Sequence, residues 1–277
     1  MKIRGLWFKH PLLYYKIKWH KCRYKYGSMP RRVPVYEGYV NDIKFIFDFS
    51  LGSNIKKMYY GIYEFYVREA LKKYLKPGGV FLDIGANVGY LTAFGMSLVG
   101  KEGTVHSFEP IPAYYERLLT LARLNPEFNF VVNNMALGES NGQISITKHK
   151  HGLGGSSIIP GFVPQEHVEE TFPVTIGRLD SYLEKCKISN ISLIKIDTEG
   201  FELPVLLGTS GFFDKSKGNL PPIVAEITPA AFKLMGKSLR ELSEFMGRYG
   251  YKCYDIFGSH RIDLEKMTKG ADVLFRA

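Results

Sequence analysis

Short apolar segments alternate with segments of helical periodicity along most of the chain after residue 60. The predicted strands among them span 80–84, 104–108, 130–133, 191–196 and 222–227. Between them, apolar residues recur at spacings of three and four, as in 62–75, 112–124 and 239–249. Short continuous apolar runs are typical of strands that are buried on both faces. The alternation therefore predicts an α/β fold with a mostly parallel, doubly wound sheet.

Further strands flank this repeating pattern. A hairpin is predicted over 35–39 and 44–48, and closing strands over 252–257 and 272–276. A strand at 142–147 is expected to pair with one that ends near Thr175, leaving a polar, glycine-rich loop over 148–171. Long loops in compact domains are often lids. We expect the acceptor to lie against Ser156 and Ser157. The histidines of this loop lack metal-ligand spacing, so no metal site is predicted.

The turn after the first apolar run indicates which ligand the sheet binds. In Gly85-Ala86-Asn87-Val88-Gly89, Asn87 stands where a dinucleotide-binding turn needs glycine, and Asp83 would repel phosphate. Asp83 suits a cationic amino group instead. Glu109 ends the next strand, where a carboxylate can accept hydrogen bonds from both ribose hydroxyls. These features predict a phosphate-free, positively charged nucleoside, S-adenosylmethionine.

Four segments resemble a known family. LKPGGVFLDIGANVG, HSFEP, NMALG (134–138) and LIKIDTEGFE (193–202) are similar, in order and spacing, to FkbM-type methyltransferases over roughly 60–230. The resemblance implies the Rossmann-like, seven-stranded class I methyltransferase fold and methylation of a hydroxyl oxygen, with a sugar or glycoconjugate as acceptor. Together with the turn, it places the cofactor against Glu64, Asp83, Gly85, Ala86, Asn87, Gly89, Glu109, Pro110, Asn134, Met135 and Ala136.

Two of these assignments have plain alternatives. Glu64 follows Tyr63 as in the family's tyrosine-glutamate pair, but it could equally be a solvated helix residue. Asn134 could bind the adenine edge through its amide donor and acceptor, or it could simply be a turn residue.

The catalytic candidates follow the 191–196 strand. Strand alternation puts Lys195 and Asp197 on one face, and Glu199 follows in the next turn. We expect Asp197 or Glu199 to take the acceptor's proton and Lys195 to stabilise the developing alkoxide. Glu226, at the end of the next strand, is a further candidate on the acceptor side. The alternative for Lys195 is a salt bridge to a neighbouring acid, since an unpaired buried charge is costly.

Charge separates the two ends of the chain. Of 37 Lys and Arg residues, ten lie in residues 1–36, which contain no acid, so the remainder has 27 bases and 27 acids. We therefore divide the chain into a basic, aromatic extension with the hairpin (1–55) and a catalytic domain (56–277). A helix with the stripe Leu12, Tyr15, Trp19, Cys22 and Tyr26 would either lie on an anionic membrane or acidic partner, or pack on its own domain.

Composition restricts the remaining function classes. A neutral catalytic domain disfavours a nucleic-acid substrate, and the Asp197-Thr198-Glu199-Gly200 turn lacks the Pro-Pro-aromatic segment of nucleobase amine methyltransferases. A ribose 2′-O-methyltransferase acting on RNA, or a non-catalytic cofactor-binding module docking through residues 1–32, stay as alternatives. Three widely spaced cysteines, the absence of an 18-residue apolar run and the absence of a signal peptide favour a cytoplasmic protein, peripheral at a membrane surface if residues 1–32 bind there.

Overall fold

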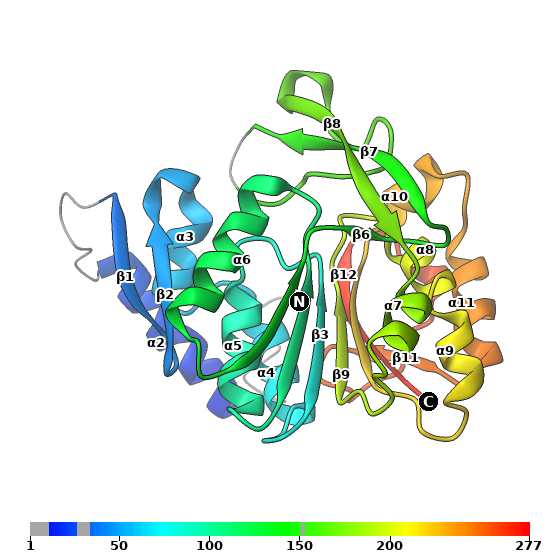
Figure 1. The fold of residues 1–277 in the computed structure, drawn as a ribbon, viewed down its shortest axis with the longest axis horizontal. Helices are drawn as coiled ribbons and strands as arrows, with labels where there is room; N and C mark the ends of the chain where they lie inside the picture. Colours follow the sequence, from blue (N-terminus) through cyan, green and yellow to red (C-terminus); the bar gives the residue numbers. More distant parts are fainter. Residues whose placement is uncertain (1–10, 27–33, 151–152) are drawn as a thin grey trace.

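A seven-stranded sheet organises the fold (Figure 1). The computed structural model describes residues 11–26, 34–150 and 153–277. The strand order is β11-β12-β10-β9-β3-β4-β5, and β12 is antiparallel to both of its neighbours. The strands are β3 (Val80–Ile84), β4 (Thr104–Phe108), β5 (Asn129–Asn133), β9 (Leu193–Ile196), β10 (Ile223–Ile227), β11 (Lys252–Asp255) and β12 (Ala271–Arg276). Chain order reverses between β3 and β9, as in a doubly wound sheet, so the predicted class I methyltransferase fold is confirmed.

Helices cover both faces of this sheet, which buries a separate core on each side. Phe81 packs into one core and its neighbour Leu82 into the other, because successive strand residues point to opposite faces. The first core lies under α3 (Ser53–Tyr59), α4 (Phe65–Tyr74), α5 (Tyr90–Val99) and α6 (Pro112–Leu124). The second lies under α7 (Leu179–Lys185), α8 (Glu202–Leu207), α9 (Ser210–Lys215), α10 (Pro229–Leu234) and α11 (Leu239–Arg248).

A small three-stranded sheet lies beyond the carboxyl ends of the central strands (Figure 1). It has the order β6-β8-β7 and consists of β6 (Ala136–Leu137), β7 (Gly142–His149) and β8 (Val168–Gly177). Both long strands extend further than the sequence predicted, because Thr147 and Lys148 still pair with Thr171 and Glu170. The loop between them is therefore shorter than 148–171, and it contains the one-turn helix η2 (Gln165–His167).

The amino-terminal hairpin belongs to the first core. Strands β1 (Val35–Val40) and β2 (Ile43–Asp48) form the predicted hairpin, and Phe45 and Phe47 are buried in the core that α5 shares. The short helix η1 (Phe49–Leu51) leads from it to α3, and η3 (Leu264–Lys266) precedes β12. The division of the chain at residue 55 stays a prediction.

Helix α2 (Pro11–Tyr26) precedes the hairpin and lies at the edge of the molecule (Figure 1). The remainder of the predicted extension, residues 1–10 and 27–33, lies outside the described ranges. Within those ranges, each helix is too short or too polar to cross a lipid bilayer.

Candidate active site

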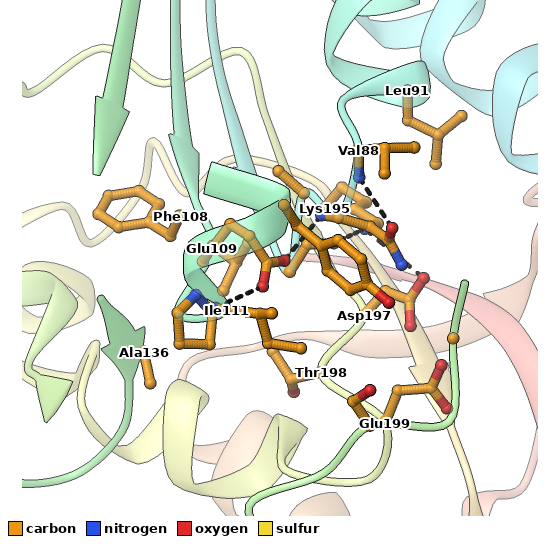
Figure 2. Close-up of a pocket in the computed structure, with 18 of the residues that line it drawn as sticks. Val88, Leu91, Phe108, Glu109, Ile111, Ala136, Lys195, Asp197, Thr198 and Glu199 are labelled. Atoms are coloured by element: carbon orange, nitrogen blue, oxygen red, sulfur yellow. Dashed lines mark hydrogen bonds and ion pairs between the residues drawn. The ribbon is translucent and has the colours of Figure 1, made fainter. Parts of the chain in front are cut away.

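A cavity opens at the carboxyl ends of β3, β4 and β9, where the chain order reverses (Figure 2). It has a volume of about 920 Å³, part of which is open to solvent. Figure 2 shows Glu109 and Ile111 on one side of it and Asp197 and Glu199 on another. A second cavity of about 890 Å³ shares Tyr63, Glu64, Gly154, Asp197 and Glu199 with the first. The two cavities therefore form one site with two compartments.

The β3–α5 turn forms one wall of the first compartment. Gly85, Ala86 and Asn87 line it as predicted, whereas Gly89 is the N-cap residue of α5 and is not among the lining residues. Lys195 Nζ donates to the carbonyl oxygen of Gly85 at 2.9 Å, which ties this turn to β9. The turn therefore presents main chain to a ligand and is held from behind by a charged side chain.

Asp83 does not line the cavity in which it was predicted to contact a cationic ligand. The carboxylate is fully buried, 3.2 Å from Lys195 Nζ, and it accepts a 2.6 Å hydrogen bond from Thr92. Register explains this position, because Asp83 and Lys195 are directly paired on adjacent parallel strands and their side chains share a face. The positive group that Asp83 binds is supplied by the protein itself.

Glu109 lines the cavity at the end of β4, where it was predicted. Its two carboxylate oxygens accept hydrogen bonds from the main-chain N–H groups of Asn87 (2.8 Å) and Ile111 (2.9 Å). Burial raises the pKa of Glu109 to about 7, and the two N–H donors only partly offset this. Each oxygen keeps a further lone pair for a ligand hydroxyl, because carboxylate oxygens accept more than one hydrogen bond.

An apolar end of the first compartment lies beyond Glu109. Pro110, Met135 and Ala136 line it as predicted. Sequence reasoning missed Ile111, Tyr114 and Leu137, which line the same end. Asn134 is outside the lining set, because its amide nitrogen donates to the carbonyl oxygens of Glu109 and Pro110. These bonds attach Asn134 to the segment that follows β4, and its predicted contact with adenine stays a prediction.

Lys195 and Asp197 lie at the junction of the two compartments. Lys195 Nζ is 3.5 Å from Asp197 Oδ2, in addition to its contact with Asp83. Burial alone would lower the pKa of Lys195, but attraction by Asp83 and Asp197 outweighs burial and raises the pKa above its ordinary value. Lys195 therefore stays protonated. It forms the salt bridge to a neighbouring acid, here Asp83, and it also lies beside Asp197.

Glu199 is held against the loop between β7 and β8. Its carboxylate accepts a 2.7 Å hydrogen bond from Gly155 N–H, and burial and repulsion by Asp197 raise its pKa to about 7. Ser156 lines the first compartment as predicted. Ser157 is buried and its hydroxyl donates to the carbonyl oxygen of Glu199, so it fixes the loop and is not among the lining residues.

The second compartment is strongly acidic. Its lining residues include Glu64, Glu226 and Asp272 in addition to Asp197 and Glu199. Burial and repulsion by neighbouring acids raise the pKa of Glu64 to about 8, that of Glu226 to about 9 and that of Asp272 to about 6. Asp272 was missed by sequence reasoning, although it lies directly opposite Glu226 in the β10–β12 ladder.

Three lining residues have unusual backbone conformations. Glu64, Asn87 and Glu199 have φ values of 43°, 54° and 53°, in the left-handed region that side-chain-bearing residues seldom adopt. Such conformations are found preferentially where binding or catalysis imposes a geometry. Because Glu64 is left-handed, α4 begins only at Phe65, later than predicted, and the Glu64 side chain lines the cavity instead of following the helix.

Comparisons with known proteins match most of the described catalytic region to one domain family. Residues 83–253 match the domain family described as methyltransferase FkbM. No curated protein matches the chain. Among solved structures, methyltransferase FkbM from Methylobacillus flagellatus is similar (15% identity, TM-score 0.44, 80% of this chain and 54% of that one), so the match spans about half of that protein's length. Fibrillarin from Aeropyrum pernix, solved with bound S-adenosyl-L-methionine, is also similar (12% identity, TM-score 0.40, 73% and 67% covered).

Proposed function

Because the chain belongs to the FkbM methyltransferase family, we propose that it methylates a hydroxyl group of a sugar or glycoconjugate, with S-adenosylmethionine as its cofactor. The observation that supports this most directly is the junction of the two compartments. There Asp197 and Glu199 face both the compartment with ribose-binding chemistry and the acidic compartment. A methyl donor in the first compartment and an acceptor in the second would meet beside these carboxylates.

The first compartment fits S-adenosylmethionine by its donor and acceptor set. Glu109 can accept hydrogen bonds from ribose hydroxyls, and the apolar end formed by Ile111, Tyr114 and Met135 can hold a planar base. Glu64 and Asp197 replace Asp83 as the acids that would bind the methionine ammonium group, since both line the cavity and Asp83 does not. The bound cofactor supplies an electrophilic methyl group.

The protein contributes orientation and proton transfer. Holding an acceptor in line with the methyl group can provide up to ~7–11 kcal/mol of the barrier reduction. Glu199 is the better base candidate, because a pKa of about 7 leaves it both ionised and basic enough near neutral pH. Glu226, whose pKa is raised to about 9, is protonated at neutral pH and acts as a hydrogen-bond donor to the acceptor. Lys195 holds Asp197 and the Gly85 turn in place.

The acidic compartment argues against the RNA alternative. Phosphodiester groups would approach Asp272, which a pKa of about 6 leaves ionised at neutral pH, and the partly ionised Glu199, and like charges in a partly buried site are costly. A non-catalytic module is disfavoured by Glu199, whose left-handed backbone and raised pKa are features of reacting groups.

The proposal is tested by substituting Glu199 with glutamine. Transfer of labelled methyl groups from S-adenosylmethionine is measured against a panel of mono- and oligosaccharides and against RNA, and calorimetry measures cofactor affinity. Glu199→Gln should lower kcat by a factor of roughly 10²–10⁴, because a positioned base is lost. Cofactor affinity should fall far less than kcat, because Glu199 is only one of the acids that line the first compartment. Glu127→Gln, on an exposed residue, is the matched control.

Three results would contradict parts of the proposal. Failure of the unmodified chain to bind S-adenosylmethionine would remove the whole assignment. Methylation of RNA in preference to every sugar would remove the acceptor class only. Full turnover by Glu199→Gln would remove this residue as the base and transfer the role to Asp197.

A further inference from the structure

Helix α2 presents two different faces, and the face that the sequence marked as apolar is the outer one. Ile17 is 4% exposed, and His20 and Tyr24 are partly buried. Tyr15 is 60% exposed, Trp19 is 57% exposed and Cys22 is exposed. The predicted stripe therefore does not pack on the domain; the side chains of its two end members, Leu12 and Tyr26, lie outside the described set.

The inner face attaches α2 to the segment between α3 and α4. His20 Nδ1 lies 2.8 Å from the carbonyl oxygen of Tyr60, and the His20 ring contacts Phe65. The Tyr24 ring meets the Tyr60 ring edge-on at 6.0 Å. This segment continues directly into Tyr63 and Glu64, which line both compartments of the active site. Helix α2 is thus fixed to the domain, and its outer face is presented in a defined orientation.

Basic residues flank the outer aromatic face on both sides. At 3.6 residues per turn, Lys16 and Arg23 fall on one side of the Tyr15–Trp19 line, and Lys18 and Lys25 fall on the other. All four are exposed, and α2 contains no acid. The guanidinium group of Arg23 lies 4.9 Å from the centre of the Trp19 ring. The exposed rings of Trp19 and Tyr15 therefore lie between two rows of basic side chains. This arrangement suits a surface that offers apolar and anionic groups side by side.

We propose that the outer face of α2 binds an anionic lipid surface. Trp19 and Tyr15 would lie at headgroup level, where amphipathic rings are favoured. Lys16, Lys18, Arg23 and Lys25 would contact lipid phosphates and carboxylates. Charge complementarity with an extended, planar anionic surface favours lipid over a protein partner, because both basic rows can then be satisfied together. This proposal does not depend on the identity of the methyl acceptor.

The test is co-sedimentation of the full chain with vesicles of phosphatidylcholine alone or with 30% phosphatidylserine. We expect binding only to the anionic vesicles, and binding that weakens as salt is added. Lys16→Gln/Arg23→Gln should lower the partition coefficient about 30-fold, since each basic residue at such a surface contributes about fivefold. Lys215→Gln/Lys217→Gln is the control, because it removes the same charge at and just beyond α9, on the opposite side of the molecule (Figure 1).

A second variant separates ring insertion from charge. In a Trp7→Phe background, Trp19 is the only indole of the chain, so quenching by brominated lipid reports its depth. We expect quenching in anionic vesicles, and weaker partition by Trp19→Ser with an unchanged thermal midpoint. Equal sedimentation of the α2 variant, the α9 variant and the unmodified chain would overturn the proposal. Absence of sedimentation would also overturn it and would assign the face to an acidic protein or a second copy of this chain.

Discussion

At the scale of single residues, the site depends on a lysine that is held from three directions. Lys195 contacts Asp83, Asp197 and the carbonyl oxygen of Gly85, and it is almost fully buried. The sequence indicated that Lys195 needed a partner, but it could not identify Asp83 as that partner. The two residues are far apart in the chain, and only the β3–β9 register brings them together.

This arrangement predicts strong energetic coupling between Asp83 and Lys195. Lys195→Gln should cost about 3–5 kcal/mol of unfolding free energy, because it leaves a buried carboxylate without its cation. Asp83→Asn/Lys195→Gln should cost at least about 1 kcal/mol less than the sum of the single changes. Urea unfolding measures all three variants. The exposed pair Lys215 and Glu184 is the control and should give a coupling of about 0–1 kcal/mol. Additive costs at Asp83 and Lys195 would contradict the assignment.

At the scale of elements, the β3–α5 turn requires glycine for close approach as well as for its backbone angle. Gly85 has a φ of 75°, and a Cβ atom there would lie 1.8 Å from the carbonyl oxygen of Asp197. Asp197 directly follows β9, and this strand must stay close for Lys195 to reach the turn. Gly78 has a φ of 78° but no heavy atom within 4 Å of such a Cβ.

The two glycines therefore form a matched pair for substitution. Gly78→Ala should cost about 1 kcal/mol of unfolding free energy, from the backbone angle alone, and should leave cofactor binding intact. Gly85→Ala should cost at least about 3 kcal/mol and abolish cofactor binding, because either β9 or the turn must move. Thermal unfolding and calorimetry measure the two effects. Equal losses in the two variants would show that close approach to Asp197 is unimportant.

Most elements could be predicted from the sequence because their patterns are local. The β3 and β4 strands and helix α6 begin and end where the apolar periodicity places them. The predicted boundaries were wrong where tertiary contacts set the ends of an element. Strands β7 and β8 are longer than predicted because they pair with each other, and α4 starts later because the Glu64 side chain lines the cavity. The site was only partly predictable for the same reason. Glu109 could be predicted as a lining residue because it directly follows a predicted strand. The positions of Ile111, Tyr114 and Asp272 in the cavity walls are set by tertiary contacts that the sequence does not show.

At the scale of the whole molecule, the acids around the two compartments make stability depend on pH. The pKa values of Glu64, Glu199 and Glu226 are raised to about 8, 7 and 9 by burial and mutual repulsion. In the unfolded chain each glutamate titrates near its ordinary value of about 4.3. The folded chain therefore retains protons that the unfolded chain has lost. Its unfolding free energy decreases as pH rises from about 5 to about 9.

Replacing one of these acids should remove part of that dependence. Glu226→Gln should raise the unfolding free energy by about 1–3 kcal/mol at pH 8 and change it little at pH 5. Urea unfolding of the ligand-free protein at both pH values measures the change. Glu127→Gln, an exposed control, should have no effect at either pH. A stabilisation that is equal at pH 5 and pH 8 would show that packing, and not ionisation, is responsible.

The acidity of the second compartment has a consequence for turnover. Once its methyl group is gone, the sulfonium of the donor becomes an uncharged thioether, so the spent form carries one positive charge less. Carboxylates at Glu64, Asp197 and Glu199, which border both compartments, would favour the charged form over the spent one. The same acids that destabilise the empty protein would thereby limit product inhibition, and exchange of spent for fresh cofactor would become easier as pH rises.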